Sequence, residues 1–325
     1  MDGTPRIADM ARFMKERHNI YLKRRNGYPG PWTNDPILQG GRFCNIFREL
    51  DTVTIWIREN IRERFADHPH LWFMLAIARY INWPPTLNML MVQDGDGGNR
   101  LYPGAWPDDP NFSPEALTAA LEDIASTGAK VYTGAYMIRA ESDPKAPWYS
   151  WTKHRYIAEI VLGRLWSHRD RWQEMLDPDH ALGKFDGYAL RQETVWQTFQ
   201  EHHYIGWGPF MAYEVVTDLR HTRYLRDAPD IMTWANAGPG AIRGLNRLHG
   251  RPLNEQPRKD QTNEEMRRYM IELNRTPALW PASWPRLEMR DVEHTLCEFD
   301  KYERVRLGEG KMRSKYDWRK ATTLK

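Results

Sequence analysis

Apolar residues recur at helical spacing along most of the 325-residue chain. Intervals of three and four residues over 42–64 predict one long amphipathic helix. The mostly apolar segment 71–81 predicts a buried helix, and Pro84 or Pro85 suits the first turn of the next one. Further helices are expected over 8–21, 115–126, 151–167, 170–177, 188–202, 209–221, 239–249, 262–275 and 286–305. The pattern therefore predicts an all-α protein.

A polar stretch rich in glycine and proline, 94–114, separates two groups of predicted helices. We therefore expect an N-terminal helical part over 1–110 and a second helical part over 111–325. The second part contains a hairpin region at 203–250 and the C-terminal helix, and we expect this part to pack as one catalytic unit. The segment 130–140 has the β-branched and aromatic content of a strand or an extended loop.

The composition is that of a folded protein, with 41% hydrophobic and 27% charged residues. The longest apolar run, 71–78, is too short for a transmembrane helix, which needs about 20 residues. The first residues lack a signal-peptide pattern, so we expect an intracellular protein with no membrane partner. The two cysteines exclude a disulfide framework. A net charge of +3 and 15 tryptophans permit binding and stacking on nucleic acid.

Several motifs of known chemistry are missing from the sequence. It contains no GxxxxGK[ST] P-loop, no GxGxxG after a predicted strand, no HExxH and no GxSxG. The acidic turn at 94–97 lacks the glutamate that closes a calcium-binding EF-hand loop, and we interpret it as a polar turn. The sequence requires no cofactor, is compatible with Mg²⁺, and leaves the metal unknown.

The segment 205–212 (IGWGPFMA) resembles the L-P-G-[VI]-G-x-x-T-A hairpin of helix-hairpin-helix DNA glycosylases. In that motif Gly206 and Gly208 allow a tight turn and close approach to DNA. The helix that follows directs its N–H groups at a phosphate. Trp207 could stack on or wedge into DNA. The alternative is an ordinary turn between helices with Trp207 as a packing residue.

A second segment, 237–248 (AGPGAIRGLNRL), resembles the stretch that follows the hairpin in those glycosylases, with Arg243 in register. Gly238 occupies the position of their catalytic aspartate and Gly240 that of their histidine. The resemblance implies a helix-hairpin-helix glycosylase-like fold with extra loops that holds DNA but does not cleave the glycosidic bond.

The chain further resembles the phage α-glutamyl/putrescinyl-thymine pyrophosphorylases, which are amino acid:DNA transferases related to the helical domain of 5-hydroxymethyluracil DNA kinases. The resembling segments are 43–54, 82–84, 133–136, the Gly206 hairpin, 238–244, 296–302 and 308–310. The resemblance implies transfer of an amino acid, such as glycine, onto pyrophosphorylated 5-hydroxymethyluracil in phage DNA, with release of pyrophosphate. Its implied partners are double-stranded DNA carrying modified thymine and a free amino acid or amine, in the cytoplasm of the infected bacterium. The identity of the amine, metal dependence, DNA sequence context and oligomeric state stay open.

The site residues follow from these segments. On the helix predicted over 42–64, Asn45, Arg48, Glu49 and Thr52 share one face, flanked by Asp51. Arginine and lysine can bind a leaving pyrophosphate, while a carboxylate can serve as base or metal ligand. The predicted catalytic residues are Arg48, Glu49, Asp51, Glu298 and Lys301; the predicted substrate-binding residues are Asn45, Arg139, Arg243 and Asp300. The predicted DNA-binding residues are Gly206, Trp207, Gly208, Lys311 and Arg313. A solvated helix face with internal ion pairs is the alternative for the first group.

Two other functions compete with the transferase. One is a non-catalytic DNA-binding helical module that works with a 5-hydroxymethyluracil DNA kinase. The other is a true DNA glycosylase that uses Asp227 or Asp230 in place of the missing aspartate. The carboxylates near 45–51 and 298–301 favour the transferase, because a protein that only binds DNA gains little from acids near a phosphate.

Overall fold

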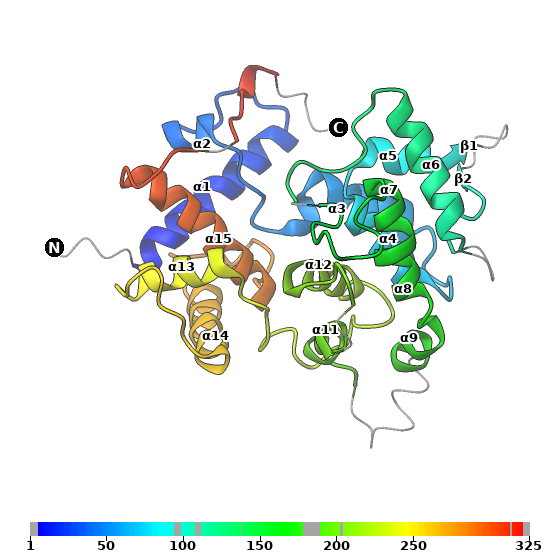
Figure 1. Cartoon of the computed structure of the whole chain (residues 1–325). Coiled ribbons are helices and arrows are strands. Elements are labelled where there is room, and N and C mark those ends of the chain that lie inside the picture. Colours follow the sequence, from blue (N-terminus) through cyan, green and yellow to red (C-terminus); the bar gives the residue numbers. More distant parts are fainter. Residues whose placement is uncertain are drawn as a thin grey trace. The chain divides into compact units, whose positions relative to one another are not determined.

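The computed structural model describes residues 6–93, 99–107, 112–136, 138–177, 189–201, 204–312 and 314–320. The chain divides into two compact units (Figure 1). Unit 1 joins Met1–Asp51 to Asp230–Lys325, and unit 2 is the continuous segment Thr52–Pro229. The two ends of the chain thus belong to one unit, whereas the sequence led us to expect a division near residue 110.

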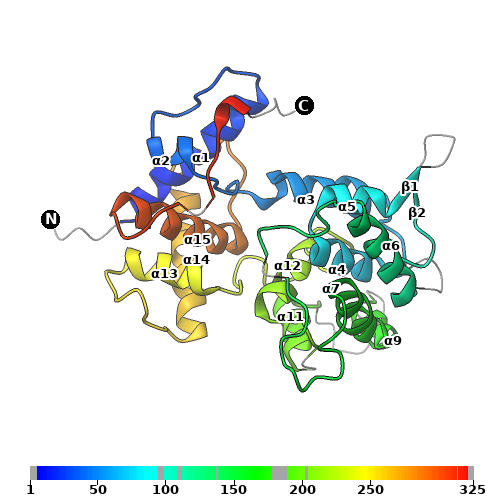
Figure 2. The ribbon, with the colours of Figure 1, turned by 45° about the horizontal axis from the view of Figure 1, so that its top comes forward.

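Unit 1 is built around the C-terminal helix α15, Met289–Arg306. The helices α1, α2, α13 and α14 all contact α15, and Figures 1 and 2 show α13 and α14 beside it. The elements of this unit are α1 (Ile7–Arg25), α2 (Pro36–Gly40), the 3-10 turn η1 (Arg48–Leu50), α13 (Pro239–Leu248), α14 (Lys259–Arg275), α15 and η4 (Trp318–Lys320).

Two glycines let α13 pack unusually close to α15. A Cβ atom at Gly240 would lie 2.4 Å from the Cys297 Sγ, and one at Gly244 would lie 2.2 Å from the Leu296 carbonyl oxygen. Real Cβ atoms essentially never come that close. The glycine at the position of the glycosylase histidine therefore has a packing reason of its own.

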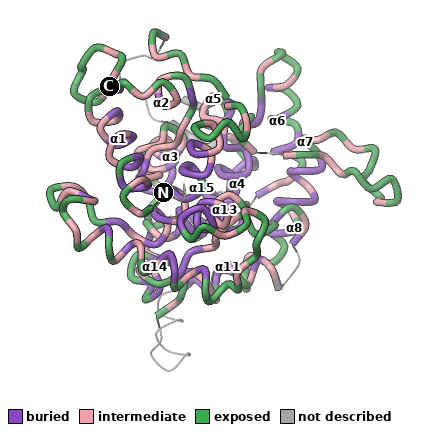
Figure 3. The backbone as a smooth tube through the Cα atoms, turned by 90° about the vertical axis from the view of Figure 1, so that its left-hand side faces the viewer, coloured by how far each residue is buried: buried purple, intermediate pink, exposed green. Residues whose placement is uncertain are grey.

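Unit 2 is organised around α4, Leu71–Ile81, in which every residue is buried (Figure 3). This matches the prediction of a buried helix over 71–81, because a helix that is almost entirely apolar belongs in a core. The other elements are α3 (Thr52–Ile57), the π-helix η2 (Arg58–Arg62), α5 (Pro84–Met89), β1 (Met91–Gln93), β2 (Asn99–Leu101), α6 (Pro114–Ser126), α7 (Lys153–Arg155), the π-helix η3 (Tyr156–Leu162), α8 (Gly163–Trp166), α9 (Arg169–Leu176), α11 (Gln192–Glu201) and α12 (Pro209–Leu219).

The prediction of an all-α protein is confirmed, apart from the short antiparallel pair β1–β2. No helix among the described residues has the length and apolar character to cross a membrane. The segment 130–140 forms no strand in the part of it that the structure describes. The acidic turn at 94–97 lies outside the described residues.

The prediction of a single helix over 42–64 is wrong. The chain is irregular up to the η1 turn, and a regular helix begins only at Thr52. The Asn45 backbone N–H and side-chain amide both donate to Oδ1 of Asp51, at 2.9 and 3.0 Å, and the amide also donates to the Leu50 carbonyl. These local bonds compete with the helical hydrogen bonds and close 45–51 into a loop.

Candidate functional site

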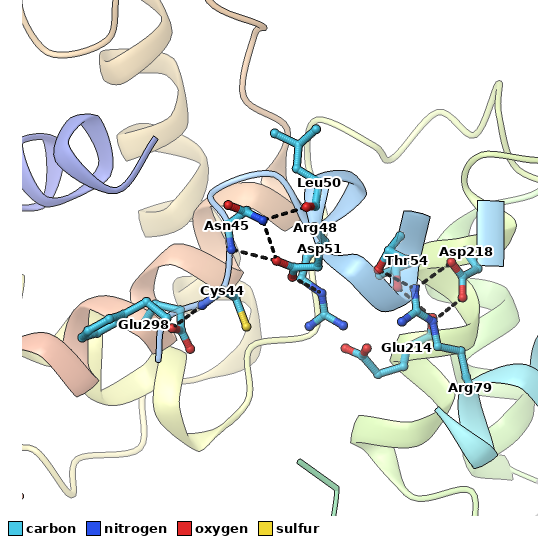
Figure 4. Close-up of polar contacts among 12 residues, drawn as sticks. Cys44, Asn45, Arg48, Leu50, Asp51, Thr54, Arg79, Glu214, Asp218 and Glu298 are labelled. Atoms are coloured by element: carbon cyan, nitrogen blue, oxygen red, sulfur yellow. Dashed lines mark hydrogen bonds and ion pairs between the residues drawn. The ribbon is translucent and has the colours of Figure 1, made fainter. Parts of the chain in front are cut away.

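Two segments that are 254 positions apart in sequence meet in unit 1. The Cys44 backbone N–H donates to Oε2 of Glu298 at 2.9 Å (Figure 4). The Lys301 ammonium lies 2.7 Å from the same carboxylate and 4.8 Å from the centroid of the Phe43 ring. The structure thus brings together residues 43–51 and 298–301, the two segments that the sequence predicts to carry the catalytic residues. We call residues Arg17, Cys44, Arg48, Asp51, Glu298 and Lys301 the loop–helix cluster.

Arg17, on α1, is the member of this cluster that the sequence analysis missed. Its side chain is buried and donates to the Phe43 carbonyl oxygen at 3.1 Å. The sequence held a usable signal, because Arg17 follows Phe13 and Met14 by four and three positions and so falls on the apolar face of its helix. A charged residue on a buried face is rare unless it has partners.

Burial dominates the electrostatics of the cluster. It raises the pKa of the Cys44 thiol well above its ordinary value, and the nearby carboxylates of Glu298 and Asp51 add to this. Burial also raises the pKa of Asp51, more than the Arg48 guanidinium lowers it. It lowers the pKa of Arg17 despite the carboxylates near it. The cluster therefore holds charges in a partly dehydrated place, where each interacts strongly with its neighbours.

The predicted catalytic cations are paired with carboxylates inside the cluster. Nε of Arg48 lies 3.6 Å from Oδ2 of Asp51, and Lys301 pairs with Glu298. Both pairs join residues three positions apart, as the alternative of internal ion pairs expects, but the cluster is not a solvated helix face. Glu49 lies elsewhere, near Asp291 at the start of α15, where its charge helps to raise the pKa of that aspartate.

Asp300 and Arg243, predicted to bind substrate, form part of a separate network that ties α13 to α15. The buried Asp300 carboxylate accepts from Nε of Arg243 and from Nε of Arg247, each at 2.9 Å. Arg247 also contacts Glu309 at 2.6 Å. These contacts give Asp300 a structural role, whereas the Arg243 side chain keeps 41% of its surface exposed.

The segment that resembles the glycosylase hairpin does join two helices, α11 and α12, in unit 2. Gly206 has φ +83°, and a Cβ atom there would meet the Tyr80 hydroxyl at 2.8 Å. Both reasons for glycine are therefore present, a left-handed backbone and a close contact. Gly208 is exposed, is the N-cap residue of α12, and has no described atom within 4 Å of the position of a Cβ.

The stacking role considered for Trp207 is wrong, and its alternative as a packing residue holds. Its side chain is 1% exposed, and the indole N–H donates to the Val161 carbonyl oxygen at 3.2 Å. The ring packs against Tyr80 and Phe199 at centroid distances of 5.2 and 5.4 Å. An aromatic ring enclosed in this way offers no face to a base. The exposed aromatic residue at the hairpin is instead Phe210, at 52%.

The remaining predicted residues are not brought into one site. Arg139 is exposed in unit 2, Lys311 is exposed in unit 1, and Arg313 lies outside the described residues.

A buried ion pair in unit 2 also escaped the sequence analysis. The Arg79 guanidinium contacts both carboxylate oxygens of Asp218 and donates to the Thr54 hydroxyl at 3.1 Å (Figure 4). On the same helix as Asp218, the buried Glu214 accepts from the Tyr136 hydroxyl at 2.6 Å. Both carboxylates lie on α12, one turn apart, and together they attach this helix to its neighbours.

Comparison with known proteins identifies the family to which this chain belongs. A family model described as the helical domain of 5-hmdU DNA kinase matches residues 4–312. A 5-hmdU DNA kinase of Bacillus phage SP10 is 24% identical over 322 residues, which cover 94% of this chain and 45% of that kinase. The chain thus spans about half the length of this curated relative. No solved structure matches.

These findings correct two predictions. The assignment to the amino acid:DNA transferases is wrong, because the model that matches is that of the kinase helical domain, which the sequence analysis had named only as a relative. The predicted transfer of an amino acid with release of pyrophosphate is overturned on the same ground, since the family and the phage relative are both named for a kinase. The chain belongs to the family of 5-hmdU DNA kinase helical domains.

Proposed function

We propose that this chain is the DNA-recognition module of a system that phosphorylates 5-hydroxymethyldeoxyuridine in phage DNA. In this proposal the chain binds DNA that carries the modified base and presents that base to a phosphotransferase. The observation that carries it is the family match over 4–312, combined with the lack of a GxxxxGK[ST] P-loop in these 325 residues.

The hairpin supplies the proposed contact with the DNA backbone. The first N–H groups of any helix have no acceptor within the helix, and Gly208 provides no side chain to accept from those of α12. Gly206, Gly208, Pro209 and Phe210 are all exposed, so a phosphate can approach this helix end. A helix-hairpin-helix arrangement like that of DNA glycosylases is the finer fold that we propose on this basis.

The loop–helix cluster has a more limited role in this proposal. Its cations already have carboxylate or carbonyl partners, so we do not assign it the bulk of DNA binding. Arg139, Lys311 and Arg243 keep exposed surface and are the proposed additional phosphate contacts.

The central experiment measures binding and phosphoryl transfer separately. Binding of the purified chain is compared between duplexes that contain 5-hydroxymethyluracil and matched duplexes that contain thymine, at one fixed salt concentration. Transfer of labelled phosphate from ATP is then measured with the chain alone and with an added P-loop 5-hmdU kinase. We expect preferential binding, no transfer by the chain alone, and transfer in the combined reaction. Transfer by the chain alone would show that it is itself the kinase, and equal binding to both duplexes would refute recognition of the modified base.

The hairpin contact is tested by Gly208→Asp with Gly208→Asn as its matched control. Both side chains fit the open space at this position, and both are good N-cap residues, so neither should destabilise the fold. Only the aspartate adds a negative charge where the phosphate would bind. We expect Gly208→Asp to weaken DNA binding by roughly tenfold while Gly208→Asn changes it little. Equal affinities for the two variants would show that the hairpin does not touch DNA.

A further inference from the structure

Three side chains of different chemistry converge in unit 1. Cys44, Asp51 and His294 each offer one ligand atom, and these three atoms all lie within 4.8 Å of one another. Cys44 and Asp51 come from the loop that Asn45 closes, and His294 comes from α15. All three residues are partly buried. Among the residues that the structure describes, this is the one group of three or more such side chains placed to hold an ion.

Hydrogen bonds from outside the group already orient two of the three ligands. Oδ1 of Asp51 accepts from the Asn45 backbone N–H and from its side-chain amide, and this fixes the plane of the carboxylate (Figure 4). The Cys44 backbone N–H donates to Glu298, which fixes the segment that carries the thiol. Metal ligands in proteins are typically held by such outer contacts.

We propose that Cys44, Asp51 and His294 form a binding site for one divalent transition-metal ion of the Zn²⁺ type. Thiolate and imidazole ligands favour Zn²⁺ over Mg²⁺ and Ca²⁺, which prefer oxygen. Metal–ligand bonds of about 2.0–2.3 Å place tetrahedral ligand atoms roughly 3.3–3.8 Å apart. Since the three atoms lie within 4.8 Å of one another, they approach by at most about 1.5 Å on binding. Cys44 binds as thiolate and gives its proton to solvent. Three protein ligands leave a fourth position for water or a hydroxyl group.

The Arg48 side chain competes with the metal ion for the Asp51 carboxylate. Its Nε lies 3.6 Å from Oδ2 of Asp51, the oxygen that Asn45 leaves unbonded, and so provides the positive charge that a metal would provide. The other cations of the cluster are engaged elsewhere, Lys301 with Glu298 and Arg17 with the Phe43 carbonyl. Removal of the Arg48 charge should therefore strengthen metal binding, whereas removal of a ligand should weaken it.

The test uses the full chain with Zn²⁺ and Co²⁺ as probes. Zn²⁺ per chain is measured by mass spectrometry after dialysis, and Co²⁺ binding is followed through the thiolate-to-metal charge-transfer absorption. We expect about one ion per chain and a thiolate band in the wild-type protein and in Cys297→Ser, which removes the other cysteine. Cys44→Ser should lose the band, and Cys44→Ser and His294→Gln should each bind Zn²⁺ at least about tenfold more weakly. Arg48→Gln should bind it more tightly.

Two outcomes overturn the proposal. One is a wild-type chain that retains no Zn²⁺ and shows no thiolate band with Co²⁺. The other is a band that persists in Cys44→Ser or disappears in Cys297→Ser, which would place the ion at the other cysteine. Because the second outcome can be read from Cys297→Ser alone, the proposal stays testable even if Cys44→Ser does not fold.

Discussion

At the scale of single residues, burial decides what the charged groups of this protein can do. Asp291 shows this most clearly, since it lies at the start of α15 and accepts the Glu288 backbone N–H at 2.9 Å. Burial raises the pKa of Asp291 to about 7, and the carboxylates of Glu288 and Glu49 contribute to this. A group whose pKa is higher in the folded than in the unfolded state binds its proton more tightly in the folded state.

Asp291 should therefore make the stability of the protein depend on pH. Its contribution is complete below the ordinary aspartate pKa near 4 and is lost as pH rises through about 7. In Asp291→Asn the side-chain carbonyl can still accept the Glu288 backbone N–H, but the side chain at position 291 no longer titrates. We expect denaturant unfolding to show a loss of up to about 1.4 kcal/mol per pH unit across this window in the wild-type chain, and a flatter profile in Asp291→Asn. If the unfolding free energies of the two proteins change in parallel with pH, Asp291 is not the source of the pH dependence.

The pair of Arg79 and Asp218 gives a second prediction at this scale. Both side chains are 1% exposed. Burial opposes the charge on Arg79, but the Asp218 carboxylate more than compensates and raises the pKa of the arginine. Arg79→Met should cost about 3–5 kcal/mol in unfolding free energy, because it leaves Asp218 buried without its counter-charge. The double variant Arg79→Met with Asp218→Leu should recover much of that loss. A single variant as stable as the wild type would show that the pair does not hold α4 to α12.

At the scale of elements, the contact between α13 and α15 depends on having no side chain at two positions. Gly240 and Gly244 are one turn apart and face the backbone and side chain of 296–297. This close contact also brings Arg243 and Arg247 within reach of Asp300. The glycosylase resemblance places Gly240 at the position of the family's histidine, whereas the structure explains both Gly240 and Gly244 through packing.

Gly244→Ala should therefore destabilise the fold. The added methyl group would lie against the Leu296 carbonyl oxygen, a backbone atom that cannot rotate away. We expect a loss of about 2–3 kcal/mol, typical of overpacking. Gly238→Ala is the matched control, because a Cβ there meets no described atom within 4 Å and φ is −76°. Equal midpoints of thermal unfolding for the two variants would show that α13 and α15 can separate without cost.

At the scale of the whole molecule, the chain forms two compact units, and unit 2 is inserted between the two segments of unit 1. Each unit has its own buried helix surface, α15 in one and α4 in the other. Units of this kind often open separately in native-state hydrogen exchange.

We expect Gly244→Ala to lower the exchange protection of amides in α13 and α15 by roughly tenfold or more, and to change that of α4 and α12 much less. Arg79→Met should show the opposite pattern. Uniform loss of protection across the chain in both variants would mean that the two units unfold as one.

The local pattern of the sequence determined most of the helices. The segment 71–81, which begins with the apolar run 71–78, forms α4 with the predicted bounds, and the proline signal places the start of α5 at Pro84. These succeed because helical periodicity and proline geometry act over a few neighbouring residues. The pair of glycines at 206 and 208 likewise predicted the turn before α12, since a left-handed backbone at Gly206 is a local requirement.

Only the tertiary structure decided which residues share a site. Arg17 reaches the loop at 43–51 because α1 and α15 pack together, and Glu298 meets Cys44 across 254 positions of sequence. In unit 2, packing against Tyr80 and Phe199 encloses Trp207, which local sequence could equally have left exposed. The packing of α13 on α15 likewise explains Gly240 and Gly244, since the atoms that a side chain there would meet belong to another helix. Periodicity shows which face of a helix is buried, but the identity of the neighbour depends on how distant segments share one core.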